Sequence, residues 1–381
     1  MSLYDLLIRD GEVFIPERGF QSGWDVAISQ NKIASVAPSI DADQAERVLD
    51  AGEAMVVPGL IDLHTHLGFE IHRQVVYPEK VCPSSGVTTA VDMGSTGAFT
   101  FPWYRDRILE KSAVRLYEFI NIASLGTIAI HTPYYEEHYS EYIDVQDTVK
   151  MIEEHRDYIR GIKVFGTSAM VNEPVLEGIR AAVQAGQAVG LPVAVHVSVK
   201  PPEISDILAL LRPGDIVTHT YTPYDQGILD EEGVIKSSVW EARERGVIFD
   251  LGHGAGSFTF HVARRAMEQD FLPDSISTDV YAANTEQVVK DLLTTMSKFL
   301  NLGLSLEETL QRVTINPARA IGEKELGTLA PGAPADLALL RLDEGSFTFY
   351  DSRRETLEGT RQLTCEMTIH NGKIIYERKD K

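Results

Sequence analysis

The sequence predicts an α/β fold: a (β/α)8 TIM barrel with a small β-sandwich domain built from both termini. Two observations support this prediction. Strand-like and helical patterns alternate through the middle of the chain, and short β-rich runs separated by turns fill both ends. The length of 381 residues suits one barrel and one smaller domain. The predicted boundaries are residues 1–55 and 325–381 for the β domain and 56–324 for the barrel.

The barrel prediction depends on eight short apolar runs. They lie at residues 60–63, 88–93, 116–122, 159–165, 192–197, 215–218, 247–251 and 275–278. Helical patterns, such as those at 175–189 and 202–211, separate most of them. The runs recur roughly every 22–40 residues, which is the spacing that a (β/α)8 barrel requires. Polar residues just after such runs would lie at the end of the barrel where active sites are found.

The two ends of the chain are rich in short β patterns. The predicted strands are residues 4–8, 12–15, 24–28, 32–36, 335–341, 347–350, 365–369 and 373–377. Asp10-Gly11 and Gln30-Asn31 interrupt the first set, and Asn371-Gly372 predicts a hairpin turn between the last two strands. One sheet domain assembled from both termini accounts for all of them.

Composition and charge exclude several classes of function. Hydrophobic residues make up 44% and charged residues 24% of the chain, as in a globular protein. The net charge of −21 repels nucleic acids and anionic membrane surfaces. Cys82 and Cys365 are too few for a disulfide framework or a cysteine-based zinc site. We expect a small-molecule substrate and no nucleic-acid partner.

Targeting signals are not evident in the sequence. Residues 1–11 contain charges and no long apolar core, which argues against a signal peptide. The sequence contains no apolar run of about 18 residues, so no membrane span is predicted. We expect a cytoplasmic protein that forms a homo-oligomer.

The candidate site begins with two histidines after the apolar run 60–63. Alternate side chains of a strand share a face, so His64 and His66 would point in the same direction. Neutral imidazoles that converge at a strand end can bind several divalent metals. His-x-His alone is weak evidence, and a structural or surface role is the alternative.

Four later residues extend this pattern. Lys163 lies within the run 159–165, His196 and His219 follow later runs, and Asp279 closes the last one. Four imidazoles and a carboxylate could hold two divalent ions. A lysine buried beside them could lose its proton and capture CO₂ as a carbamate that bridges the ions. A lysine–carboxylate pair at the barrel rim is the alternative for Lys163.

These motifs resemble the amidohydrolase superfamily with a two-metal centre, and the resemblance spans nearly the whole chain. The motifs are Pro58-Gly59-x-Ile61-Asp62-x-His64-x-His66, Gly161-Ile162-Lys163, the later histidines with Asp279, Asn316-Pro317-Ala318-Arg319, and the run from Gly327 to Asp336. The runs 86–97, 121–123, 250–254 and 277–279 resemble the amidohydrolase/deacetylase branch, whose members are often labelled dihydroorotase or adenine deaminase. The sequence departs from that branch at Phe165, where a basic residue is expected.

The resemblance implies a hydrolase that cleaves an acyl amide or ester with a metal-bridging hydroxide. His64, His66 and Asp279 would bind the more buried of two ions, expected to be zinc, and His196 and His219 the more exposed one. Carbamylated Lys163 would join the two ions. Asp279 would also move the proton from the hydroxide to the leaving group. A cyclic-amide hydrolase would share the complete ligand set and stays an alternative. Lys163 weighs against a deaminase that uses one metal ion. A non-enzymatic scaffold protein would be expected to lack some of the ligands, and here all six positions are filled.

Three further residues are candidates for substrate binding. His253 ends the seventh run between glycines, which would allow close approach to a ligand, and Tyr221 and Asn284 follow ligand-bearing runs. The remaining histidines are predicted to serve packing or to lie on the surface: His72, His131, His138, His155, His261 and His370.

Overall fold

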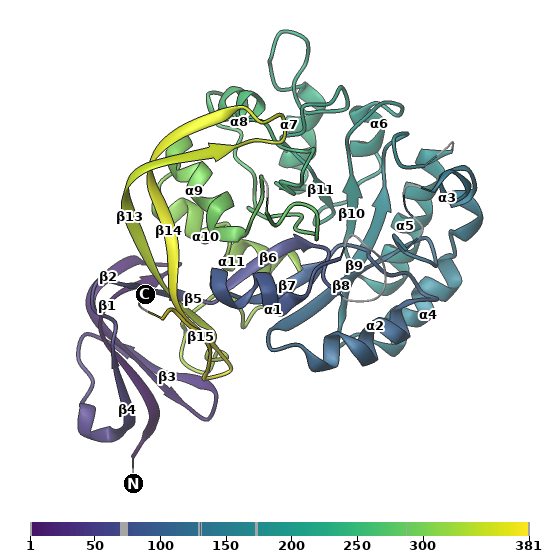
Figure 1. Ribbon diagram of the computed structural model, residues 1–381. Coiled ribbons are helices and arrows are strands. Elements are labelled where there is room, and N and C mark those ends of the chain that lie inside the picture. Colours follow the sequence, from purple (N-terminus) through teal and green to yellow (C-terminus); the bar gives the residue numbers. More distant parts are fainter. Residues whose placement is uncertain are drawn as a thin grey trace.

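The computed structural model describes residues 2–68, 75–128, 130, 132–171, 174–286 and 288–379. Figure 1 shows two parts, a barrel of alternating strands and helices and a sheet formed by the two ends of the chain. The predicted α/β architecture is confirmed.

The barrel contains seven parallel strands that lie side by side in chain order. They are β6 (Leu60–Thr65), β7 (Val87–Asp92), β8 (Arg115–Asn121), β9 (Ile159–Phe165), β10 (Val193–His196), β11 (Ile216–Thr218) and β12 (Ile248–Asp250). The strands are almost entirely buried on both faces because side chains fill the barrel and helices cover it. Continuous apolar runs, rather than alternating ones, are therefore the pattern that marks them.

An extended segment occupies the eighth position and closes the ring. Ser275 forms a parallel bridge with Asp250 at the end of β12, and Val280 forms one with Thr65 of β6. Backbone hydrogen bonds from His253 N–H to Ser277 O and from Asp279 N–H to His64 O continue the pairing on the two sides. The predicted eighth run thus occupies the expected place, although its pairing is too irregular to form a regular strand.

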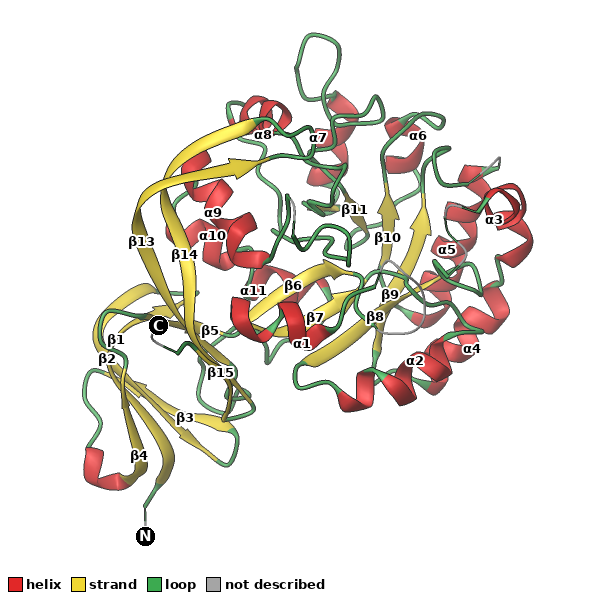
Figure 2. Ribbon diagram, in the orientation of Figure 1, coloured by secondary structure: helices red, strands yellow, loops and turns green. Residues whose placement is uncertain are grey.

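Helices surround the barrel strands (Figure 2). They are α1 (Pro78–Val81), α2 (Phe101–Arg107), α3 (Pro133–His138), α4 (Val145–Glu154), α5 (Val175–Val189), α6 (Ile204–Leu208), α7 (Ser237–Glu244), α8 (Phe260–Met267), α9 (Leu292–Leu302), α10 (Leu306–Gln311) and α11 (Ile315–Ala320). Helix α5 has the predicted bounds because its apolar residues recur with helical spacing and Gly190, at φ +71°, ends it. No helix in the described ranges is long and apolar enough to cross a membrane.

The terminal strands form one mixed sheet of eight strands. The order is β15-β14-β13-β5-β1-β2-β3, and β4 pairs with β1. The strands are β1 (Tyr4–Ile15), β2 (Gly19–Ser29), β3 (Lys32–Ala37), β4 (Ala45–Asp50), β5 (Met55–Pro58), β13 (Leu337–Tyr350), β14 (Thr356–His370) and β15 (Lys373–Glu377). The short 3-10 turn Ala42–Gln44 precedes β4. The sheet joins both ends of the chain, as predicted.

Two details of this sheet correct the predicted strands. Residues 4–8 and 12–15 form the single strand β1, in which the pairing with β2 shifts register around Gly11 instead of turning back. The predicted runs 335–341 and 347–350 likewise belong to the single long strand β13, which begins at Leu337 and so leaves out residues 335 and 336. A bulge absorbs the irregular residues in each strand, so the chain bends without reversing. The hairpin turn at Asn371-Gly372 is confirmed, with positive φ at both residues.

The strands β13 and β14 extend well beyond the terminal sheet. Figure 1 shows this long hairpin arching from the terminal sheet over the side of the barrel that carries α8 and α9. Strand β14 makes extensive contact with α9, where Ser297 Oγ accepts a hydrogen bond from Leu363 N–H at 2.9 Å. The hairpin therefore connects the two parts of the molecule.

Candidate metal centre

The first two histidines face the aspartate that follows the eighth segment of the barrel. His64 Nε2 lies 3.5 Å from Asp279 Oδ1, and His66 Nε2 lies 3.2 Å from the same oxygen. One ligand atom from each of the three side chains lies within 4.8 Å of the other two. Imidazole nitrogens and carboxylate oxygens are ligands that divalent metals such as zinc accept. This group could hold a metal ion.

Hydroxyl groups orient both imidazole rings. His64 Nδ1 lies 2.7 Å from Thr218 Oγ1, and that hydroxyl donates to Asp250 Oδ2 at 2.8 Å. Because the Thr218 proton is directed to Asp250, the Thr218 oxygen accepts from His64 Nδ1–H. His66 Nδ1 similarly lies 2.9 Å from Ser95 Oγ. With Nδ1 held in this way, each ring keeps Nε2 as a metal-binding atom.

Backbone contacts hold Asp279 opposite these histidines. Its N–H donates to His64 O at 2.7 Å, and Asn284 Nδ2 donates to Asp279 O at 2.8 Å. Asp279 has φ +48°, a conformation that few residues other than glycine and the short polar residues adopt. Gly254 lies against the carboxylate, because a Cβ at that position would approach Oδ2 to 2.4 Å. The position of Asp279 is therefore set by its neighbours on both sides.

Lys163 projects from β9 toward the histidines. Its Nζ lies 3.5 Å from His64 Nε2. Gly94 gives the lysine side chain room, since a Cβ there would lie 2.7 Å from Lys163 Cγ. Burial lowers the pKa of Lys163 to about 8, although the charges of Asp279 and Asp250 act in the opposite direction. More of this amine is neutral at pH 7 than in an ordinary lysine, and the neutral amine is the form that reacts with CO₂.

The other two histidines lie beside the first pair. His219 Nε2 is 2.8 Å from His196 Nδ1, and the centroid of the His219 ring is 5.0 Å from that of His64. His219 has φ +71°, and its Nδ1 lies 2.7 Å from Gly252 O. Since a carbonyl can only accept, Nδ1 of His219 carries the proton and Nε2 keeps its lone pair. The structure thus brings all four imidazoles to one end of the barrel.

Burial keeps three of these histidines neutral. Desolvation lowers the pKa of His219 to about 4 and holds the pKa values of His64 and His196 well below their usual range. The positive charge of Lys163 lowers all three further. Neutral imidazole is the form that binds metal. The donor set therefore fits divalent metal ions at neutral pH.

A cavity of about 160 Å³ opens onto the centre. His66, Lys163, His196 and Asp279 contribute to its wall. A small molecule in this cavity would reach side chains from both halves of the predicted ligand set.

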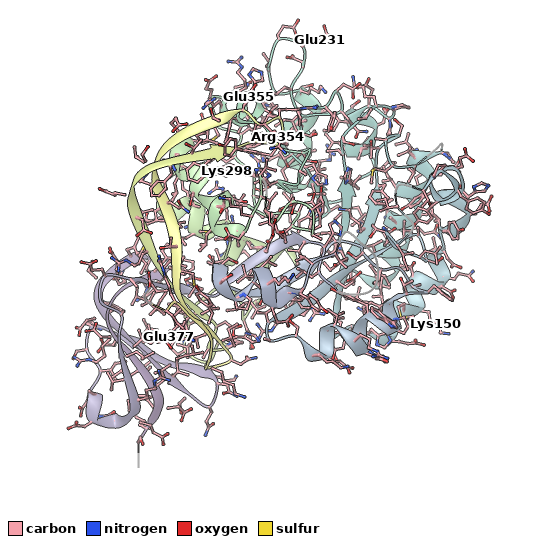
Figure 3. All side chains as sticks on the ribbon, viewed as in Figure 1. Lys150, Glu231, Lys298, Arg354, Glu355 and Glu377 are labelled. Carbon is pink, nitrogen blue, oxygen red and sulfur yellow. The ribbon has the colours of Figure 1, made fainter. Side chains whose placement is uncertain are left out.

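The three predicted substrate-binding residues lie outside the described wall of this cavity. Tyr221 is buried and donates to Phe271 O at 2.6 Å. His253 is buried, with Nδ1 2.8 Å from Gly254 O and Nε2 2.8 Å from the Nζ of Lys298, a lysine labelled in Figure 3. These positions do not support a contact with substrate.

Asn284 differs from the other two candidates because it touches a predicted ligand. Its Nδ2 supports the backbone carbonyl of Asp279, and its Oδ1 accepts from Tyr281 N–H at 2.9 Å. Its geometry indicates support of the aspartate rather than contact with substrate.

The remaining histidines lie away from the centre where the structure describes them. His261 is exposed, and His138 is half-buried and stacks on Tyr134. His155 packs against Phe101, and His370 contacts Asp336 in the terminal sheet. His72 and His131 lie outside the described residues.

The residues that orient the ligands were not predicted from the sequence. Asp250 is fully buried, and its Oδ1 accepts from the hydroxyls of Ser275 and Ser277 at 2.6 and 2.7 Å. A carboxylate inside the apolar run 247–251 was the available signal, because a buried charge requires hydrogen-bonding partners. Ser95 and Thr218 carried no comparable signal, since hydroxyl residues are common in strands and in the loops that follow them.

The fold and the centre together define a barrel protein with a candidate metal site at the carboxyl ends of its strands. The sequence profile described as the amidohydrolase family matches residues 55–375. The chain belongs to the amidohydrolase family, which confirms the resemblance that the motifs predicted.

Individual relatives carry different names. The chain is 32% identical to a deacetylase from Enterococcus faecalis over 376 residues, which cover 97% of this chain and 99% of the relative. A crystal structure of an adenine deaminase superposes with a TM-score of 0.92 at 32% identity, covering 98% of this chain and 100% of the other. A crystal structure of a dihydroorotase gives a TM-score of 0.89 at 28% identity, with the same coverage.

Proposed function

We propose that this amidohydrolase uses two divalent metal ions to cleave an acyl amide or an ester, as a deacetylase does. The observation that carries the proposal is the position of buried Lys163, whose Nζ lies 3.5 Å from His64 Nε2 among four imidazoles and a carboxylate. A lysine buried at that position could take part in metal binding as a carbamate shared by two ions. The imidazole-rich donor set suits zinc.

The candidate ligands divide into two groups. His64, His66 and Asp279 would hold one ion, since their ligand atoms already lie close together. The neighbouring His196 and His219 would hold the second. Carbamylated Lys163 would be shared by both ions.

The chain's own residues supply positioning and proton transfer. When bound, the two ions would activate water and polarise the acyl carbonyl. The Asp279 carboxylate, 3.2 Å from His66 Nε2, would accept the proton of the attacking water and deliver it to the leaving nitrogen or oxygen. The hydrogen bonds of His64 and His66 to hydroxyl groups hold their rings in place throughout.

Two related activities are the alternatives. A cyclic-amide hydrolase would use the same ligands, and the similarity of the chain to a dihydroorotase structure favours this alternative. A deaminase is suggested by the similarity to an adenine deaminase structure. A deaminase that works with one ion has no use for a lysine carbamate between two ions, so Lys163 argues against it.

Metal analysis combined with a substrate panel tests the proposal. Purified protein is stripped of metal, reloaded with Zn²⁺ and bicarbonate, and assayed with N-acetyl amino acids and their amides, acetate esters, cyclic amides and adenine. We expect about two zinc ions per chain and release of acetate. One ion with release of ammonia from adenine would favour the deaminase. Ring opening alone would favour the cyclic-amide hydrolase. A metal-free protein without hydrolysis would contradict all three.

A further inference from the structure

The cavity at the metal centre offers a substrate very little charge. Its charged or imidazole lining residues are His66, Lys163, His196 and Asp279, and all four are predicted metal ligands. Every other lining residue in the described part of the chain is uncharged at neutral pH. Along the described wall, a substrate therefore meets neutral groups wherever it does not meet the candidate metal ligands.

An apolar wall stands directly beside the ligands. Strand β9 places Phe165 on the same face as Lys163, because the two residues are separated by one position. Phe165 is 4% exposed, and its ring meets that of His196 edge-on with centroids 5.6 Å apart. Ile130 and Met170, which follow β8 and β9, extend this wall. The substrate group nearest the reacting carbonyl would thus lie against hydrocarbon.

The polar part of the lining suits a neutral molecule. Thr127 and Ser257 contribute hydroxyl groups, and Tyr281 adds a phenol. Such groups can hydrogen-bond an amide or an ester, but they cannot neutralise a carboxylate. A buried carboxylate that lies beyond reach of the metal ions, without a cationic side chain beside it, loses more hydration energy than a neutral amide of the same shape. Lys163 could not serve as that partner while it carries a carbamate.

We propose that the substrate is uncharged beside its scissile bond and that Phe165 is a specificity-determining residue that discriminates against carboxylates. The inference rests on the proposed function, and it adds the substrate class: neutral acyl amides or esters with an apolar substituent. Phe165 acts by excluding water and by presenting an uncharged ring beside His196, where a carboxylate would lose its hydration.

Substrate pairs that differ only in charge test the inference. Suitable pairs are N-acetyl-leucinamide with N-acetyl-leucine and N-acetyl-phenylalaninamide with N-acetyl-phenylalanine, in both enantiomers, with zinc-loaded protein. We expect kcat/KM to favour the neutral member by about 100-fold. Binding is measured in parallel as the shift in Tm that each compound produces. A larger shift or faster turnover with the charged member would overturn the inference, as would binding of neither member of any pair.

Variants of the apolar wall provide the second arm. Phe165→Arg should reverse the preference toward the charged member, and Phe165→Leu, the matched apolar control, should keep the preference for the neutral one. Met170→Arg introduces the same charge at a half-buried position should Phe165→Arg fail to fold. An unchanged preference in a folded arginine variant would overturn the assignment of the wall. Absence of turnover with every compound counts against the proposed function, whereas the Tm shifts still decide the charge preference.

Discussion

Thr218 connects a candidate metal ligand on one strand with a buried carboxylate on another. Its hydroxyl accepts from His64 at 2.7 Å and donates to Asp250 at 2.8 Å. Asp250 in turn accepts from two serines of the eighth segment. The orientation of one imidazole therefore depends on three neighbouring barrel positions.

Replacing this threonine should weaken metal binding without removing a ligand. Thr218→Val keeps the shape but leaves His64 Nδ1–H without its acceptor, so we expect zinc affinity to fall by about 10–100-fold. Competition with a chromogenic chelator measures the change. Thr220→Val is the matched control, because the Thr220 hydroxyl donates to the backbone carbonyl of Asp250 rather than to a candidate ligand. Equal affinities in the two variants would show that Thr218 does not orient His64.

Asp279 has two proposed tasks, which one substitution can separate. Asp279→Asn keeps an oxygen for the metal but removes the carboxylate that moves the proton. We expect a loss of about 10²–10⁴ in kcat while most of the metal stays bound. Turnover and zinc content are measured on the same samples, with Asp147→Asn on the exposed face of α4 as control. Unchanged turnover would remove Asp279 from the mechanism.

The three candidate ligands that the structure groups together each follow an apolar run in the sequence. His64, His66 and Asp279 could be found in this way because strand ends are recognisable one at a time. The partners of the histidines could not, since the contacts from His66 to Ser95 and from His64 to Thr218 span 29 and 154 residues. No local pattern encodes a hydroxyl that meets an imidazole across the barrel.

Helix α9 brings a buried lysine to the loop after β12. Lys298 is fully buried, and its Nζ donates to Val288 O at 2.5 Å and lies 2.8 Å from His253 Nε2. Figure 3 labels this lysine close to the β13–β14 hairpin, whose residues 346–350 line a cavity together with it. The contact joins the helix, the loop and the hairpin.

The buried lysine predicts a specific pH dependence of stability. Burial lowers the pKa of Lys298 from 10.5 to about 7. Between these two pKa values the unfolded chain holds a proton that the folded chain lacks, so stability rises with pH in this window. Below pH 7 the lysine is charged in both states, and the full free-energy cost of burying its charge lowers the stability. Relative to Lys298→Met, the wild-type protein should gain about 1–3 kcal/mol between pH 7 and about 9.5.

Urea unfolding of both proteins across this pH range provides the measurement. Lys150→Met, at the exposed position on α4 that Figure 3 also labels, should follow the wild-type curve. Parallel curves for wild type and Lys298→Met would mean that the lysine keeps an ordinary pKa in the folded protein.

At the level of whole elements, the sequence predicted regular strands better than irregular ones. Strand β9 and helix α5 match their predicted bounds because clear patterns end at clear breaks. Strand β1 was predicted as two strands, since Asp10-Gly11 has the composition of a turn. The neighbouring strands β2, β4 and β5 hold both halves in one line, and tertiary pairing overrides the local signal.

Taken as a whole, the molecule carries a strongly negative field. Its net charge is −21, and composition alone is sufficient to predict the sign of this field. The cavity adds no described cation outside the predicted ligands to counter it. Long-range repulsion and local burial thus act in the same direction on an anionic substrate.

Salt should therefore separate the two members of each substrate pair. Added NaCl screens the field, because the Debye length falls from about 30 Å at 0.01 M to about 10 Å at 0.1 M ionic strength. We expect kcat/KM of the charged member to rise several-fold over this range, since screening removes repulsion during encounter. The neutral member should change by less than about twofold, because no net charge couples it to the field. Assays quenched at fixed times, at constant pH and zinc concentration, measure kcat/KM for both members. A fall in kcat/KM for the charged member would mean that a local positive potential at the centre dominates over the charge of the whole chain.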